Sequence, residues 1–415
     1  MKACVVFIAT YDTKGEESEF IKKQIEGRGI KCLTIDVGVG DAPQGGLPDV
    51  PLAALCEGTE HTVENIRAKP RGDAVGVASK LVEAYIKRLY ANREMTAIIG
   101  IGGAGGTQIV TQAMRALPFG LPKLMLSTLA SGNVRWYLQD SDITMMPSIA
   151  DVAGLNAITK IVFGRFAAMA AAAATWYAEN WADLSMQLAN PNITRIAMTM
   201  YGTTTKGVSR ARLAAERKGY ETVVFHASGA GGRSMERFIT EGMIQGVMDM
   251  TIAEVGGHLL KGLHDAGPHR LEAAVAKGIP MVLVPGAADT IVLPPIDEVP
   301  EKYKSGRVLN KHNPTMTTMR TNVEENIAIG NFIADKLARA TSNVTILIPR
   351  GGLSSIDKPG QVFYMPEANE ALFKTLKNRL KGTSVEVIED ERHIYDPGFG
   401  ERVFELLEMM IHEDR

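Results

Sequence analysis

The sequence has few cysteines and few aromatic residues. Three cysteines occur among 415 residues, and their odd number and the lack of a Cys-x-x-Cys pair argue against a disulfide framework or a zinc site. Cys4 and Cys32 fall within apolar strand patterns, so we expect both to be small buried hydrophobic side chains. Phe, Trp and Tyr make up only 6% of the chain, and the sequence lacks aromatic platforms for stacking single-stranded nucleic acid.

An excess of one charge is also missing. The 45 Lys and Arg residues nearly balance the 47 Asp and Glu residues, which leaves a net charge of −2. No run of like charges reaches five residues. This balance argues against a basic nucleic-acid footprint and against an acidic tail, so we predict no nucleic-acid partner.

Long apolar runs are missing as well. The apolar run near the N-terminus soon meets Asp12 and Lys14, and it lacks the length and cleavage pattern of a signal peptide. The most membrane-like stretch, Phe166–Tyr177, is 12 residues long and is bounded by Arg165 and Glu179. Since that is too short to span a bilayer, we expect a buried core helix, no membrane partner and a cytoplasmic location.

Glycine is abundant, with 41 residues, as expected of an α/β protein with many strand-to-helix turns. The apolar run at 3–9 predicts a strand buried on both faces, the pattern at 16–29 predicts a helix, and 31–38 predicts a second strand. Together they make a βαβ unit with a right-handed crossover. In the rest of this half we expect strands at 97–101, 123–127 and 142–146, and helices at 73–91, 106–117 and 152–180.

The pattern restarts after a polar break at 188–195. A strand at 195–201, a helix at 208–220 and a strand at 221–227 repeat the opening order, and Thr-Lys-Gly recurs at 205–207 after its occurrence at 13–15. We interpret this as a duplication: two Rossmann-like, doubly wound, mostly parallel subdomains at 1–190 and 191–415. Later strands are expected at 246–250, 280–285, 344–348 and 384–388. The proline-rich stretch 286–322 predicts a long functional loop without regular structure.

Ligands of open parallel sheets bind at the carboxyl ends of the strands, where this chain carries glycine-rich turns. The loop Gly102–Thr107 lies between a buried strand and a helix, so its amide groups and the helix N-terminus predict an anion site. The alternative is that its glycines only permit close helix–sheet packing. Lys14 supplies a cation and Asp12 a Mg²⁺ contact through water, unless these two residues serve turn chemistry and helix capping.

In the second half, Ser228–Ser234 is the expected equivalent of this loop. Arg233 would bind phosphate or carboxylate beside Glu236, unless it is a surface residue at a helix start. Arg320 is a second candidate for anion binding, with pairing to a glutamate of the next helix as the alternative. Three histidines occupy strand ends or loops and suggest an acid–base cluster, although each alone is more often structural: His226, His312 and His393. No His-x-His or HExxH pattern is present, so metal ligands stay unassigned.

Several long motifs occur at strand ends. In chain order they are ATYDTKGEE, IGGAGGTQ, LPFGLPKLMLSTLASGNV, DVAGLN, FHASGAGGRSME, HNPTMTTMRT and HIYDP. Together they resemble uncharacterised protein family 0261, the family of the ATP-binding N-terminal region of the tomato mosaic virus resistance protein. The resemblance covers nearly the whole chain. It implies two Rossmann-like subdomains, ATP binding and a homodimer or higher homo-oligomer, and it supplies no reaction.

Transferred residue by residue, the resemblance implies nucleotide contacts from three strand-end loops. These are Asp12, Thr13 and Lys14, then Gly102, Gly103, Gly105, Gly106 and Thr107, then Thr128, Ser131 and Gly132. Asn133 stands where the family pattern has Asp, which removes a possible metal or ribose contact.

Two functions follow from these observations. The first is an ATP-dependent enzyme that uses Mg²⁺ and acts on a small anionic metabolite in the cleft between the subdomains. Its substrate would contact Arg233, Ser234 and Arg320, and its catalytic residues would be Glu236, His312 and His393. The second is a regulatory module in which ATP controls dimerisation without catalysis.

Overall fold

The chain folds into two compact units, Met1–Leu188 and Ala189–Arg415. The computed structural model describes residues 1–341 and 343–413. The division lies two residues from the boundary near 190 that the polar break suggests. Each unit contains its own sheet and its own hydrophobic core, and each is described by itself below.

Unit 1 is a doubly wound α/β domain around one parallel sheet. Its strand order is β2-β1-β3-β4-β5, and every neighbouring pair is parallel. The elements in chain order are β1 (Cys4–Ala9), α1 (Tyr11–Glu26), β2 (Lys31–Asp36), α2 (Leu52–Cys56), α3 (Val63–Arg67), α4 (Arg71–Ala91), β3 (Ala97–Gly102), α5 (Ala104–Arg115), β4 (Lys123–Ser127), α6 (Arg135–Leu138), β5 (Ile143–Pro147) and α7 (Ala157–Leu188).

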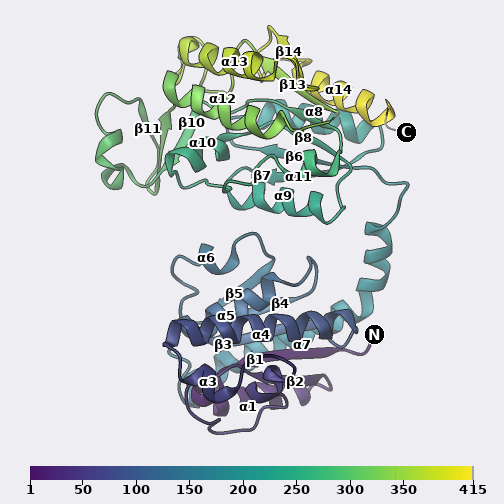
Figure 1. Ribbon diagram of the computed structural model, residues 1–415, viewed down its shortest axis with the longest axis vertical. Helices are drawn as coiled ribbons and strands as arrows, with labels where there is room; N and C mark the ends of the chain where they lie inside the picture. The colour runs from purple at the N-terminus through teal and green to yellow at the C-terminus, as the bar shows by residue number, and fades with distance from the viewer. Residues whose placement is uncertain (342, 414–415) are drawn as a thin grey trace. The chain divides into compact units, whose positions relative to one another are not determined.

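Both faces of this sheet are covered by helices (Figure 1). Val6 and Ile8 of β1 join the core beneath α4 and α5, whereas Val5 and Phe7 join the core beneath α1 and α7. Alternate residues of a strand point to opposite faces, so burial on both faces explains the uninterrupted apolar run. All three cysteines are free and buried, which confirms the expectation for Cys4 and Cys32.

Unit 2 repeats this plan with one more strand. Its parallel sheet has the order β14-β13-β9-β8-β6-β7, so β6 lies between β7 and β8 just as β1 lies between β2 and β3. The elements of this sheet and its helices are β6 (Arg195–Met200), α8 (Thr205–Arg217), β7 (Glu221–His226), α9 (Ala230–Thr240), β8 (Gly246–Asp249), α10 (Ala253–Leu260), α11 (Ala273–Lys277), β9 (Met281–Leu283), α12 (Val323–Leu337), β13 (Val344–Pro349), α13 (Pro366–Leu380), β14 (Glu386–Asp390) and α14 (Phe399–Glu413).

The repeated Thr-Lys-Gly triplet lies near the start of the helix that follows the first strand in both units. In both copies the glycine lies under another loop. A Cβ on Gly15 would lie 1.8 Å from the carbonyl oxygen of Gln44, and one on Gly207 would lie 2.4 Å from that of Ile394. The triplet therefore marks a close packing contact that both units share.

The proline-rich stretch 286–322 is more regular than its composition suggests. It forms the antiparallel sheet β10-β12-β11, from β10 (Thr290–Leu293), β11 (Leu309–Asn313) and β12 (Met316–Arg320), with two short 3-10 helices at Ile296–Glu298 and Glu301–Tyr303. The expectation of a loop without regular structure is therefore wrong. The prolines lie between strands or in the tight turn after β11, where they interrupt no ladder hydrogen bond.

Helix α7 differs most from its expected form. It has 32 residues, and by length and composition it is apolar enough to cross a membrane, although 44% of its most apolar 18-residue window is buried within the protein. Only one face of α7, which carries Phe163 and Phe166, packs against the sheet. Ile158 and Met186 are 63% and 64% exposed, so the expectation of a buried core helix holds for one face alone.

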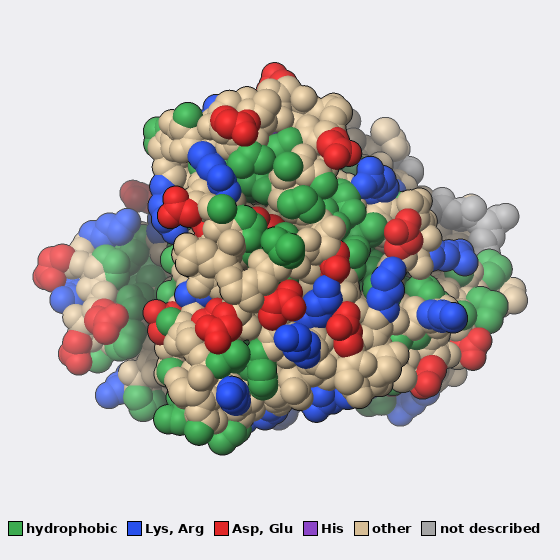
Figure 2. Space-filling model, turned by 90° about the horizontal axis from the view of Figure 1, so that it is seen from below, with side chains coloured by type: hydrophobic (Ala, Val, Ile, Leu, Met, Phe, Trp, Pro, Cys, Tyr) green, Lys and Arg blue, Asp and Glu red, His purple; other side chains and the backbone are tan. Residues whose placement is uncertain are grey.

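Acidic and basic side chains are interspersed over the face of the molecule seen in Figure 2, with hydrophobic side chains between them. This distribution agrees with the near-balance of charge in the sequence.

Candidate functional site

The strand order of unit 1 creates a topological switch point at the carboxyl ends of β1 and β3. The chain leaves β1 for β2 on one side and later returns to β3 on the other side. The loops after these two strands therefore diverge, and such a crevice is the usual ligand position in open parallel sheets. They begin at Thr10 and at Gly103 and belong to the strand-end stretches 10–15 and 102–107 that the sequence predicts, although the helices α1 and α5 already begin within these stretches.

The N-terminus of α5 lies at this switch point. Its first internal backbone hydrogen bond runs from the amide of Thr107 to the carbonyl of Gly103, at 2.9 Å. The amides of Ala104, Gly105 and Gly106 precede it and have no acceptor among the described residues. Three free N–H groups on a 12-residue helix, reinforced by its dipole, are an arrangement that can accept an anion.

The glycines of this loop divide into two pairs with different roles. A Cβ on Gly102 would lie 3.0 Å from the Cα of Gly106, so these two glycines allow the helix to pack against the strand. At Gly105 a Cβ would meet nothing within 4 Å, and at Gly103 the nearest atom would be Oγ1 of Thr128, at 3.7 Å. Packing therefore explains Gly102 and Gly106, whereas Gly103 and Gly105 leave the helix N-terminus uncovered.

The loop after β1 contributes one cation. Lys14 is half-buried and has no ion-pair partner among the described residues. Asp12, in contrast, is engaged, because its Oδ2 accepts the amide of Gly40 at 2.9 Å and its Oδ1 accepts the hydroxyl of Thr13 at 3.3 Å. The alternative role in turn chemistry therefore accounts for Asp12. The ammonium group of Lys14 is available to an anion.

The loop after β4 lies beside the glycine loop, because β4 is the neighbour of β3. Thr128 donates its amide to the carbonyl of Gly102 at 3.2 Å, while Ser131 and Gly132 are exposed. The hydroxyl of Thr107 is buried and lies 2.7 Å from that of Ser127. Thr107 thus fixes α5 to β4 with its side chain instead of presenting that side chain to a ligand.

The sequence analysis missed Asp36, which ends β2. Its Oδ1 accepts the amides of Tyr11 and Gly38, at 2.9 and 2.7 Å. Burial raises the pKa of this carboxyl group. Asp36 thereby occupies the N-terminus of α1, which explains why this helix begins at Tyr11, earlier than expected. Of the two helices at the switch point, α5 is the one with an open N-terminus.

The glycine loop of unit 2 is not the equivalent of the loop in unit 1. It follows β7, which is an edge strand, and it leads into α9. Here a carboxylate of the protein itself occupies the helix N-terminus, since Oε1 of Glu254 accepts the amides of Gly229 and Gly232 at 2.6 and 3.0 Å. An external anion would have to displace Glu254, so the expectation of an open anion site at this loop is wrong.

A buried ion network joins Glu254 to Arg270, which the sequence analysis also missed. Arg270 is 1% exposed and donates to both oxygens of Asp249, at 2.7 and 2.8 Å, and to Glu254 at 3.0 Å. Glu236, a predicted catalytic residue, accepts the amide of Leu271 and also contacts Arg270 at 3.1 Å. Burial raises the pKa of Glu236, and the charge of Arg270 opposes that rise.

The guanidinium groups of the two predicted anion-binding arginines donate hydrogen bonds to other groups of the protein. Arg233 donates to the carbonyl of Asp265 at 2.6 Å. Arg320 is 1% exposed and donates to the side chains of Asn369 and Thr321 and to three backbone carbonyls. The alternative pairing of Arg320 with a helix glutamate is also wrong, because Glu325 pairs with Arg307. Ser234 lies half-buried on α9.

The predicted catalytic histidines differ in their surroundings. His393 is buried, and both of its ring nitrogens are engaged, Nε2 with the carbonyl of Ser354 at 3.0 Å and Nδ1 with the amide of Tyr395 at 2.9 Å. It is therefore a structural residue in this arrangement. His312 is exposed on β11.

A different histidine lies at the switch point of unit 2. Nδ1 of His264 is 3.0 Å from the hydroxyl of Tyr201, the residue that follows β6. The Tyr201 ring also stacks on His226, with centroids 5.5 Å apart. Burial, followed by the nearby charges of His226 and His312, lowers the pKa of His264 to about 4. His264 is thus a neutral, half-buried imidazole, and no partner of its Nε2 is found in the described part of the chain.

Residues 1–341 and 343–413 contain no group of three or more His, Cys, Asp or Glu side chains arranged to hold a metal ion. A divalent cation at the switch point of unit 1 would therefore rely on oxygen atoms of its ligand and on water, with Asp12 as the acidic residue of the β1–α1 turn.

Comparison with known proteins assigns both halves of the chain. Residues 3–179 match the N-terminal domain and residues 194–411 the C-terminal domain of an uncharacterised protein family, UPF0261. The chain belongs to the UPF0261 family. A UPF0261 protein of Clostridium tetani is 43% identical and covers 96% of both chains. The ToMV resistance protein Tm-1 of Solanum lycopersicum is 36% identical over 91% of this chain, which spans about half (52%) of the tomato protein.

Solved structures share less with the chain. The crystal structure of Acinetobacter baumannii MurG is 12% identical, with 98% of this chain covered and a TM-score of 0.24.

Proposed function

We propose that this UPF0261 protein binds the phosphates of a nucleotide at the switch point of unit 1. The observation that carries the proposal is the open N-terminus of α5, where the amides of Ala104, Gly105 and Gly106 lack acceptors. Lys14 adds a cation from the neighbouring loop, and Thr128 adds a hydroxyl. The family resemblance selects ATP, and Mg²⁺ would accompany it to neutralise phosphate charge.

We further propose that ATP is used in a reaction on a small anionic metabolite. Support comes from the Tyr201–His264 pair in unit 2, because a neutral imidazole held by a phenol is equipped for acid–base chemistry. Tyr201 and His264 replace Glu236 and His393 as the acid–base candidates, since the latter two are engaged in structural hydrogen bonds. The site lies in a cytoplasmic homo-oligomer in this proposal.

The alternative is a regulatory module in which ATP sets the oligomeric state without catalysis. The two functions separate when ATP turnover is measured across a library of small carboxylates and phosphates. Tight ATP binding with turnover that one metabolite stimulates supports the enzyme, and loss of that turnover in His264→Gln assigns the acid–base group. Tight binding with no turnover for any metabolite favours the module.

The binding step has its own test in Gly103→Val, measured by titration calorimetry with ATP and Mg²⁺. The backbone of Gly103 is extended (φ −84°, ψ −154°), and a Cβ there makes only an ordinary contact with Thr128, so the variant should fold. We expect the affinity for ATP to fall at least tenfold, equivalent to about 1.4 kcal/mol. Unchanged affinity in the folded variant would show that the α5 N-terminus is not the phosphate site.

A further inference from the structure

Helix α7 carries an exposed line of residues that runs along its whole length. The line has a period of seven residues and consists of Ile158, Arg165, Ala172, Glu179 and Met186, all of which are exposed. A period of seven is the spacing at which one helix keeps a continuous seam against another. The opposite side of α7 packs on its own sheet, so this seam has no partner within the described residues of unit 1.

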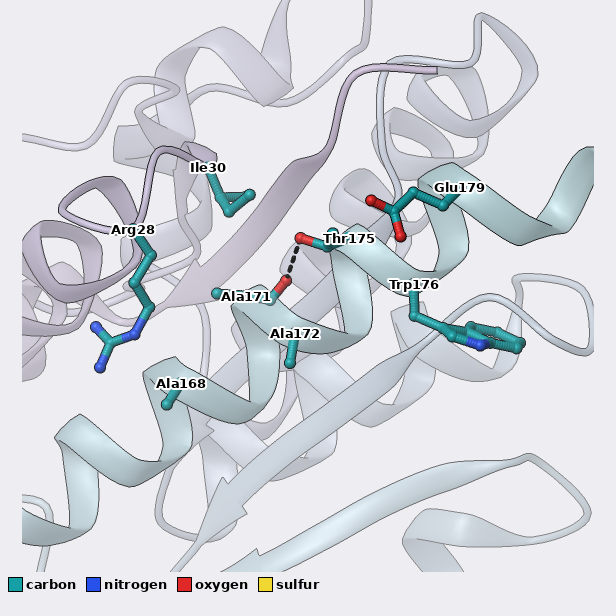
Figure 3. A pocket seen from close by; sticks show the side chains of 8 residues that line it. All are labelled: Arg28, Ile30, Ala168, Ala171, Ala172, Thr175, Trp176 and Glu179. Atoms are coloured by element: carbon teal, nitrogen blue, oxygen red, sulfur yellow. Dashed lines mark hydrogen bonds between the residues drawn. The ribbon is translucent and has the colours of Figure 1, made fainter.

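A groove of about 510 Å³ lies beside this seam (Figure 3). Its floor consists of small side chains, among them Ala168 and Ala172, and Trp176 stands at its side and is 49% exposed. Arg28 and Ile30, from the segment between α1 and β2 beside α7, also line the groove. A surface that combines small residues with one large exposed aromatic ring has both the hole and the knob of a helix–helix contact.

The seam is self-complementary about Ala172. Arg165 and Glu179, of opposite charge, lie seven residues to either side, and apolar Ile158 and Met186 lie fourteen residues to either side. A two-fold axis at Ala172 would place two such helices antiparallel. Arg165 of each copy would then lie opposite Glu179 of the other. Within one helix Arg165 and Glu179 are about 21 Å apart, so the two ion pairs would lie at well separated points of the interface.

We infer that the α7 seam is the interface between two copies of this chain, packed antiparallel about Ala172. In this arrangement Ile158 contacts Met186 of the second copy, and Ala168 receives Trp176 of the second copy. Small residues at the axis allow the helices to approach closely. A self-complementary patch is what a two-fold symmetric contact requires. This inference deepens the proposed self-association, because it names the surface that forms it.

A lipid bilayer fits the same helix less well. Phe163 and Phe166 are buried against the sheet and would have to leave it for the helix to enter a membrane. Arg165 and Glu179 would then lie in hydrocarbon without a charged partner, whereas a second copy supplies one to each. The charge pattern of the seam therefore favours a second copy.

The test measures the mass of the full-length protein by light scattering and its dimer dissociation constant by sedimentation. We expect the wild type to show twice the chain mass of 44.8 kDa. Arg165→Glu and Glu179→Arg should each raise the dissociation constant at least tenfold, because each places like charges opposite one another. The double variant Arg165→Glu/Glu179→Arg should restore dimerisation, since it re-forms both pairs with reversed polarity.

Controls separate failure of this surface from failure of self-association. Lys80→Glu reverses an exposed charge on α4, on the other face of the sheet, and should leave the dissociation constant unchanged. A monomeric wild type would overturn both the self-association and the α7 surface. Single variants that stay dimeric, or a double variant that is not restored, would overturn the α7 surface alone. A monomer that co-sediments with phosphatidylcholine vesicles would assign the seam to a membrane instead.

Discussion

Both oxygens of Asp249 accept hydrogen bonds from Arg270, at 2.7 and 2.8 Å, in the interior of unit 2. Glu254 accepts a third bond from the same guanidinium and two more from the amides at the start of α9. One arginine thus joins the ends of β8, α9 and α10. A buried arginine with fixed partners is a structural element, and its removal leaves carboxylates without compensation.

Arg270→Met should therefore destabilise unit 2 strongly. We expect a loss of about 3–5 kcal/mol in the free energy of unfolding, since the carboxylates of Glu236, Asp249 and Glu254 would lose their shared cation. Urea denaturation followed by circular dichroism measures this loss. As a matched control, Arg212→Met removes an exposed arginine paired with Glu216 and should cost less than about 1 kcal/mol. Equal effects of the two substitutions would contradict the role of Arg270.

Gly105→Ala should separate binding from stability at the α5 N-terminus. Nothing lies within 4 Å of a Cβ at this position, so we expect folding to be unchanged or slightly stabilised. The added methyl group stands at the free amides, so ATP binding should weaken severalfold. The comparison is Gly76→Ala in α4, another helical glycine with open space around it. If both variants bind ATP like the wild type, the ligand does not approach Gly105.

The neutral state of His264 predicts a pH effect on stability. Its pKa is lowered from the ordinary 6.5 to about 4 in the folded protein, so the unfolded chain binds the proton more readily. Its contribution is complete above pH 6.5 and is lost as the pH falls toward 4. His264→Gln should therefore flatten the loss of stability between pH 6.5 and 5 relative to the wild type. NMR titration of the imidazole, with a pKa near 6.5, would contradict this.

Asp289 should change the stability with pH in the opposite direction to His264. Burial, followed by repulsion from Asp357, raises its pKa from 3.8 to about 6. The folded protein thus binds this proton more tightly, and the stabilisation, complete below pH 3.8, disappears as the pH rises through 6. Asp289→Asn keeps an acceptor for the hydroxyl of Ser354, which lies 2.7 Å away, and it should remove the decline in stability between about pH 4 and 6. Denaturation at several pH values measures both slopes.

The fold class was predictable because burial of a strand dictates which of its residues are apolar. Strand β1 lies in a parallel sheet covered on both faces, so nearly every side chain in it must be apolar, and the run can be read without a structure. The recurrence of Thr-Lys-Gly revealed the duplication because both glycines pack under a loop. The strands at 290–293 and 316–320 were missed because nearby prolines outweighed their short apolar patterns, although those prolines lie outside the paired residues.

The position of the glycine-rich loop before α5 was predictable for a local reason, and the rest of the candidate site was not. A glycine-rich turn between a strand and a helix is continuous in sequence, and Gly103 and Gly105 lie where that reasoning placed them. Arg320 and His393 carry the residue types of a binding site. Each also has a hydrogen-bond partner far along the chain, Asn369 at 49 positions from Arg320 and Ser354 at 39 positions from His393, which the sequence does not reveal. No local pattern distinguishes an arginine or histidine that is satisfied from one that is free.

The amino-acid sequence by itself determined the two α/β units, their buried strands and the position of the open glycine loop, because each depends on neighbours in the chain. Only the tertiary structure decided which polar groups are already bound. Glu254 closes the N-terminus of α9, Asp36 closes that of α1, and the N-terminus of α5 stays open. It also left one seam of α7 uncovered while burying the opposite face. The reason is physical: a hydrogen bond or an apolar contact is satisfied by whatever the fold brings near, and the pairing of distant strands sets that proximity.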